Sequence, residues 1–203
     1  MNHSKPIIRL IPIPPWVAPM SDDPETALIK EVALGDRQSF KLLFVRYEKP
    51  LLAYMMKTLG DRQVAEEMVN DVMFEVWKQA RLFRGNSRLS TWIFGIAHNK
   101  ALNQLRRKGR RNVVGLEAVE DIANGQKSPQ QLAEERDVRE RIKSAIEELP
   151  PQQREVVELT FYHGFSYEEI ARILKCPAGT VKTRMFYARQ RLREVLAGVE
   201  LGG

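Results

Sequence analysis

The sequence has few of the residues that form disulfides, metal centres or membrane spans. It contains one cysteine, Cys176, and three histidines that lie far apart in the chain. One cysteine cannot form a disulfide within the chain, and these residues show none of the spacings typical of zinc sites. No apolar run is long enough to cross a bilayer. We therefore expect no metal, no cofactor and no membrane insertion.

Catalytic motifs are lacking as well. No Ser/His/Asp set, paired-carboxylate motif, glycine-rich phosphate loop or cluster of metal ligands can be recognised. Scattered histidines and carboxylates are ordinary in a soluble protein. The sequence therefore predicts no catalytic residues, and the interpretation as an enzyme is disfavoured.

Positive charge, in contrast, is in excess. The 203 residues include 32 Lys and Arg against 26 Asp and Glu, which gives a formal net charge of +6. Such an excess favours an anionic partner. Hydrophobic residues make up 43% of the chain, enough to bury a core. A folded protein with an anionic partner is expected.

The first 23 residues form a proline-rich extension. Five prolines interrupt its apolar residues, and a signal peptide needs an unbroken helical apolar segment. The composition favours an extended, polyproline-like conformation. We expect a cytoplasmic protein whose folded part begins near Pro24.

Apolar residues recur at helical spacing through most of the remaining chain, and no convincing strand or repeat is present. Between 112 and 131 the periodicity fades and glycine, serine and proline accumulate, which is typical of a linker. The sequence thus predicts an all-α protein with two small helical domains, 24–111 and 132–198, joined by a flexible linker. Helices are expected at 26–47 with a break near Gly35–Asp36, and at 50–59, 62–79, 89–107, 132–149 and 151–162.

The C-terminal domain carries a helix-turn-helix pattern. Ser166 and Glu169 fit a capping box that opens a short helix, Tyr167–Leu174. A turn containing Cys176 leads to a second helix, Thr180–Val195. The position of Cys176 in this turn favours a role as a small capping or packing residue over a role as a redox sensor. Two short helices across a tight turn are typical of DNA-binding proteins.

The second of these helices is suited to reading duplex DNA, because a recognition helix places its N-terminal residues in the major groove. A solvated basic face is the alternative interpretation, and the preceding helix-turn-helix pattern favours DNA. The candidate contacts to bases or phosphates are Lys182, Thr183, Arg184, Phe186, Tyr187 and Arg189.

A second candidate surface combines aromatic, amide and basic residues between Phe83 and Arg111. Aromatic rings beside cations suit a surface that stacks unpaired bases and follows a phosphate backbone. Asn99 and Asn103 share one helix face and can bond to base edges. Phe94 and Ile96 are better explained as core residues, Trp92 fits either interpretation, and the basic run with Arg106 and Arg107 could also be a solvated helix end.

The order of these motifs resembles the extracytoplasmic-function (group IV) sigma factors of the sigma-70 family. The resemblance covers about residues 24–196 and rests on an acidic helix with Ala65–Asp71, the segment from Phe83 through Trp92 and Asn99 to Arg107, and the helix-turn-helix. It implies a σ2 domain that melts and reads the −10 element and a σ4 domain that reads the −35 element. It also implies core RNA polymerase, promoter DNA and an anti-sigma factor as partners.

The resemblance also implies roles for individual residues. Glu67, Asn70 and Asp71 match the region that docks on polymerase, and Glu75 shares their helix face. The −35 contacts match Lys182, Thr183, Phe186 and Tyr187 of the recognition helix. The −10 residues are expected among Arg84, Asn86, Ser87, Trp92, Asn99, Asn103, Arg106 and Arg107.

Residues 1–19 depart from the family, in which Met20 would be an ordinary start. The main alternative is a helix-turn-helix regulator that binds duplex DNA without polymerase. Such a regulator would not need the acidic helix or the aromatic and basic segment.

Overall fold

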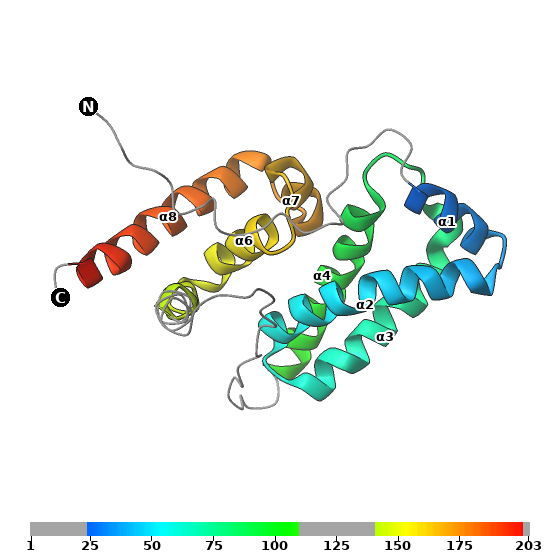
Figure 1. Ribbon diagram of the computed structural model, residues 1–203, viewed down its shortest axis with the longest axis horizontal. Helices are drawn as coiled ribbons and strands as arrows, with labels where there is room; N and C mark the ends of the chain where they lie inside the picture. The colour runs from blue at the N-terminus through cyan, green and yellow to red at the C-terminus, as the bar shows by residue number, and fades with distance from the viewer. Residues whose placement is uncertain (1–23, 110–140, 201–203) are drawn as a thin grey trace, which may run out of the picture.

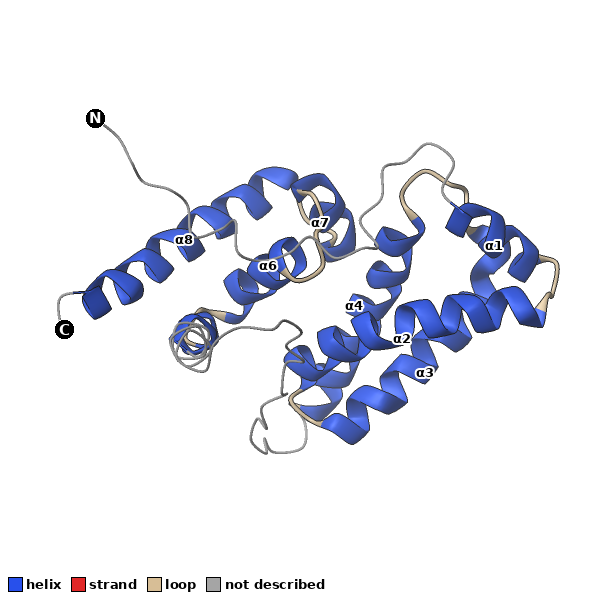
Figure 2. Cartoon of the chain, in the orientation of Figure 1, coloured by secondary structure: helices blue, strands red, loops and turns tan. Residues whose placement is uncertain are grey.

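The computed structural model describes residues 24–109 and 141–200, and of 24 and 195–200 only the backbone. Every regular element in these two ranges is helical, as Figure 2 shows. The predicted all-α class is therefore confirmed. The expected N-terminal extension, 1–23, and linker, 112–131, lie outside the described residues. No helix within the two described ranges is long and apolar enough to cross a membrane.

The N-terminal half contains four α-helices and a short 3₁₀ turn. Asp36 and Asp61 cap the second and third helices, because their carboxylates accept the backbone N–H groups of Ser39 (2.8 Å) and Val64 (3.1 Å). Gly60 ends the second helix in the left-handed conformation that glycine tolerates. The elements are α1 (Pro24–Ala33), α2 (Arg37–Leu59), α3 (Arg62–Gln79), η2 (Ala80–Leu82) and α4 (Leu89–Lys108).

Helix α2 differs from the expectation of separate helices at 26–47 and 50–59. The break near Gly35–Asp36 is present, but α2 then continues through Pro50 to Leu59. A proline inside a helix removes one backbone hydrogen bond and costs about 3 kcal/mol. Pro50 and its neighbours Tyr47, Leu51 and Tyr54 are all buried, so packing of the side chains of α2 offsets that cost.

Helix α2 packs against α1, α3 and α4, and Figure 1 shows α4 crossing it at a steep angle. Leu43, Leu51, Val72 and Ile93 are fully buried where these helices meet. Burying such a side chain stabilises the fold by about 1.5–3 kcal/mol. The bundle thus fixes which faces of α3 and α4 remain at the surface.

The C-terminal half contains a helical segment at 141–147 followed by α6 (Pro151–Phe161), α7 (Tyr167–Leu174) and α8 (Ala178–Glu200). The predicted capping box is confirmed: Glu169 N donates to Ser166 Oγ, and Ser166 N donates to the Glu169 carboxylate (2.8 Å). Lys175 takes the left-handed conformation at the turn (φ 52°), where many such turns have glycine. Together α7, this turn and α8 form the predicted helix-turn-helix.

The two halves pack against one another, which the sequence did not predict. Helix α7 lies against α4 (Figure 1), and an aromatic cluster fills the contact. The His163 ring is 4.8 Å from Phe94 and 6.0 Å from Tyr54, and Phe165 is 5.0 Å from Phe94, measured between ring centroids. All four side chains are buried. The hydrophobic core therefore runs continuously across both halves.

His163 makes the packing of the two halves depend on pH. Burial, followed by the nearby charge of Lys57, lowers the pKa of its imidazole from 6.5 to about 3. Below pH 6.5, the His163 imidazole binds a proton when the two halves are separated, whereas it stays neutral when they are packed together. The free energy that this group contributes to the packed state is therefore fully present above that pH, and it falls by up to about 1.4 kcal/mol per pH unit below it. Burial raises the pKa of Glu158, and protonation of this buried carboxyl as the pH falls opposes the loss.

We therefore expect the thermal midpoint of the protein to fall when the pH is lowered from about 7.5 to about 5.5. His163→Phe, which keeps an aromatic ring and removes the titrating group, should flatten this dependence. Differential scanning calorimetry of both proteins measures it. Parallel pH profiles for the two proteins would contradict the assignment to His163.

Candidate nucleic-acid and polymerase interfaces

Helix α8 carries the residues that are predicted to contact DNA on its outer face. Lys182 and Thr183 are exposed, and Phe186 and Tyr187 are 65% and 53% exposed although both are aromatic. The opposite face is buried against α6 and α7 and is formed by Val181, Met185 and Ala188. Large aromatic rings left in solvent beside cations suit contacts with DNA bases and sugars.

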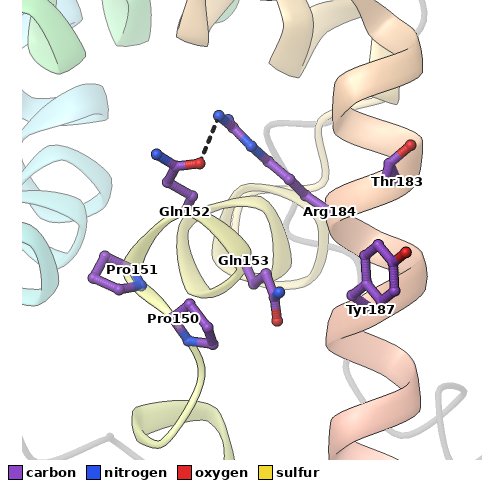
Figure 3. A pocket seen from close by; sticks show the side chains of 7 residues that line it. All are labelled: Pro150, Pro151, Gln152, Gln153, Thr183, Arg184 and Tyr187. Atoms are coloured by element: carbon purple, nitrogen blue, oxygen red, sulfur yellow. Dashed lines mark hydrogen bonds between the residues drawn. The ribbon is translucent and has the colours of Figure 1, made fainter.

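Two arginines of α8 are oriented by neighbouring helices. The Arg184 guanidinium is half-buried and donates to Gln152 Oε1 of α6 (2.9 Å), as the dashed line in Figure 3 shows. Arg189 is exposed, and its Nη2 lies 3.3 Å from the Tyr167 hydroxyl of α7. Both arginines were expected at the DNA surface, but Gln152 could not be recognised from the sequence, because no local pattern signals a contact between residues 32 positions apart.

A shallow groove lies between the start of α6 and the recognition helix (Figure 3). Arg184 and Gln152 reach toward each other across it, while Thr183 and Tyr187 project from α8. The N-terminus of α6 thus adjoins the first turns of the recognition helix. The groove is lined by Pro150, Pro151, Gln152, Gln153, Thr183, Arg184 and Tyr187.

The second candidate surface follows α4 and the loop before it. Arg84 and Asn86 are exposed in the loop, and Ser87 is half-buried. Trp92 is also half-buried, with its ring 5.4 Å from that of Phe83. An aromatic pair with one accessible side is compatible both with packing and with base stacking.

The side chains of the C-terminal part of α4 are more exposed to solvent. Asn103, Arg106 and Arg107 are exposed. Asn99 is half-buried, and its amide donates to the Gly95 carbonyl of its own helix (2.6 Å). Phe94 is fully buried, which confirms its interpretation as a core residue. Within this surface, Asn103 therefore offers the more accessible amide.

Helix α3 has the expected division into two faces. Val69, Val72 and Val76 are buried, and Glu67 and Asn70 are exposed on the other side. One feature of this outer face was not expected from the sequence: the Phe74 ring is 61% exposed. An exposed aromatic beside polar groups is typical of protein interfaces.

Lys100 of α4 lies beside one edge of this acidic face. Its ammonium group is 3.8 Å from an Asp71 oxygen and 3.9 Å from a Glu75 oxygen. Asp71 remains exposed, whereas Glu75 is half-buried and also accepts a hydrogen bond from Gln79. Glu67 and Asp71 are therefore the more accessible carboxylates among the predicted docking residues.

Known proteins carry the same two segments. Residues 43–111 match the family model for sigma-70 region 2, and residues 139–192 match the model for sigma-70 region 4. The ECF RNA polymerase sigma-E factor of Escherichia coli K12 is 32% identical over 176 residues, covering 83% of this chain and 92% of the relative. The chain belongs to the ECF RNA polymerase sigma factors. It is thus a factor for promoter-specific transcription initiation.

Further similarities agree with this family. The RNA polymerase sigma-H factor of Pseudomonas aeruginosa is 29% identical, with 87% of this sigma factor and 96% of the relative covered. The solved structure of the sigma factor RpoE in complex with the anti-sigma factor NepR, from Bartonella quintana, has a TM-score of 0.64 and 29% identity. The similarity covers 79% of this chain and 98% of that chain. CnrH, solved in complex with the cytosolic domain of CnrY, shares the fold (TM-score 0.60, 24% identity, covering 87% and 99%).

Proposed function

We propose that this sigma factor reads its promoter with two surfaces: α8 contacts the −35 element as duplex, and α4 with the loop before it melts and reads the −10 element. The outer face of α8 carries this proposal, because Lys182, Thr183, Phe186 and Tyr187 lie exposed together directly after the helix-turn-helix turn. A recognition helix reads duplex DNA with such N-terminal residues.

The −10 surface is supported by the combination of groups on α4. Asn103 can bond to a base edge, Trp92 can stack a base on its open side, and Arg106 and Arg107 can follow the phosphates. The loop residues Arg84 and Asn86 extend this surface from the N-terminal end. A melted strand needs such mixed stacking and electrostatic contacts, whereas a duplex reader does not.

The outer face of α3 is proposed to dock on core polymerase. Glu67, Asn70 and Asp71 are accessible there, and exposed Phe74 supplies an apolar centre. The net charge of the protein is +6, but this face carries carboxylates. Its charge therefore distinguishes the polymerase contact from the DNA surfaces. A regulator that binds duplex DNA alone would use none of these residues.

The boundaries of the two domains are proposed to be 24–111 and 132–198, which enclose both family matches. The protein acts in the cytoplasm together with polymerase and performs no catalytic step of its own. An anti-sigma factor is a further proposed partner, since a similar sigma factor was solved with one.

Lys182→Ala tests the −35 surface. Loss of a good bidentate base contact costs about 1–3 kcal/mol, so the variant holoenzyme should bind promoter fragments more weakly while core binding is unchanged. Lys49→Ala, which removes the same charge from the exposed surface of α2, serves as the control. Electrophoretic mobility shifts with holoenzyme measure both. Equal promoter affinity for Lys182→Ala and parent would refute the role of Lys182.

Asn103→Ala tests the −10 surface. A lost hydrogen bond to an unpaired base costs about 0.5–1.5 kcal/mol, so fewer open complexes should form on duplex promoters. A premelted template should relieve only the melting part of the defect. Permanganate footprinting measures the melted region, with Gln38→Ala removing an exposed amide of α2 as the control. An unchanged footprint would show that Asn103 has no part in melting.

Glu67→Lys with Asp71→Lys tests polymerase docking. Reversing two interface charges should weaken core binding by roughly 1–2 kcal/mol, or roughly 5- to 30-fold, at low salt and less at high salt. Thermal stability should change little, because both side chains are exposed. Glu147→Lys with Glu148→Lys makes the same charge change on the C-terminal half. Full affinity of the α3 variant for core at low salt would exclude docking through this face.

A further inference from the structure

The groove between the start of α6 and helix α8 has the charge that suits an anionic group. Within the described part of the chain, no acidic side chain lines it, and Arg184 supplies its positive charge. The first turn of α6, which is fully described, also has no acidic residue, although carboxylates are favourable at a helix N-terminus. A negatively charged ligand therefore meets attraction in this groove and no carboxylate that would repel it.

Arg184 lies on a different side of α8 from the exposed candidates for base contacts. It is one helical turn from Val181 and from Ala188, which are both fully buried. Arg184 is itself half-buried, whereas Lys182 and Phe186 are exposed. The guanidinium thus leaves α8 at the edge of its buried face, on the flank that faces α6 (Figure 3).

This flank of α8 would meet the DNA backbone. A helix about 10–12 Å in diameter fills a major groove that is about 12 Å wide. Side chains on the outer face of such a helix meet base edges, and side chains on its flanks meet the sugar–phosphate backbone. Because the start of α6 lies beside the same flank, a phosphate of one DNA strand would lie at the groove when α8 is inserted.

Gln152 fixes the direction of the Arg184 guanidinium. Its Oε1 accepts a hydrogen bond from Arg184 Nη2 (2.9 Å), which crosses the groove from α8 to α6. A guanidinium has five N–H donors, so donors remain for the oxygens of a phosphate. An arginine that is held before binding also loses less rotamer freedom when the complex forms.

The neutrality of Gln152 matters for this role. A carboxylate at this position would also hold Arg184, but it would offset the positive charge and repel a phosphate. Arg62 of α3, in contrast, is paired with the carboxylate of Glu66. An amide orients the guanidinium while its charge remains available, and the Gln152 Nε2 group is a further donor for an oxyanion.

We propose that Gln152 and Arg184 form a phosphate clamp, defined as these two side chains, which binds one backbone phosphate at the edge of the −35 element. Arg184 supplies the charge, and Gln152 is a positioning residue that holds the guanidinium toward the phosphate. Phosphate contacts fix the register of a protein on DNA, so the clamp sets the rotation of α8 in the major groove. This inference rests on the proposed assignment of α8 to the −35 element.

Promoter fragments with a single uncharged methylphosphonate linkage test the clamp. The linkage is moved along both strands across the −35 element, and the affinity for holoenzyme is measured with the parent and with Arg184→Met. One linkage should weaken binding by the parent and have no effect on Arg184→Met, which has already lost the contact. The slope of log affinity against log salt should also fall by about 0.9 in Arg184→Met.

Lys49→Met removes the same charge from the exposed surface of α2 and serves as the control for Arg184→Met. This control should show the salt dependence of the parent and its response to every linkage. Arg184→Ala is a second variant that removes the same donors if Arg184→Met does not fold. An identical response of the parent and the Arg184 variant to every linkage would overturn the clamp.

Gln152→Leu tests the positioning role. Gln152 is exposed, so the fold should be retained when its acceptor is removed. Promoter affinity should fall by roughly 2- to 12-fold, because Arg184 must then be ordered during binding. The same change should have no effect in the Arg184→Met background, whereas a merely structural role would lower affinity equally in both backgrounds. Gln38→Leu, at an exposed amide of α2, is the control.

The clamp and the −35 assignment can fail separately. If Lys182→Ala weakens promoter binding but no linkage distinguishes the parent from Arg184→Met, the assignment stands and the clamp is wrong. Additive effects of Gln152→Leu and Arg184→Met would also overturn the clamp, because Gln152 would then not act through Arg184. If one linkage does distinguish the two proteins while Lys182→Ala and changes of the −35 bases leave affinity unaltered, the phosphate contact stands and the −35 assignment is wrong.

Discussion

Helix α4 is the element on which the rest of the structure depends, because it supplies core side chains to both halves. Ile93 and Ala97 are fully buried in the bundle, while Phe94 packs against His163 and Phe165 of the C-terminal half. Burial of these residues fixes the rotation of α4 about its axis. Its remaining face, with Asn103, Arg106 and Arg107, is thereby held at the surface.

Local signals explain which elements could be predicted from the sequence. The bounds of α3 and the capping box at Ser166 follow from residues that interact within one or two helical turns. Pro50 was misjudged for the opposite reason: its local preference favours a helix end, and packing of distant residues overrides it. The packing of the two halves against one another could not be predicted, because its contacts join residues such as Tyr54 and Glu155 across 101 positions.

The same distinction applies to the candidate sites. Exposure of Lys182 and Glu67 follows from helical periodicity once the buried face is known. The orientation of the Arg184 and Asn99 side chains does not, because each is set by a specific acceptor, Gln152 Oε1 and the Gly95 carbonyl. Residue type indicated the chemistry of these sites, and tertiary contacts determine which groups are accessible.

Glu169 joins two functions in one side chain. One oxygen accepts the Ser166 N–H and so caps α7, and the other binds Thr91 and lies beside Arg88. Replacing this carboxylate would therefore weaken both the start of the helix-turn-helix and the contact of α7 with α4. Glu155 and Arg172 cap no helix, so a change at either position alters the contact between the two halves while the helix-turn-helix keeps its cap.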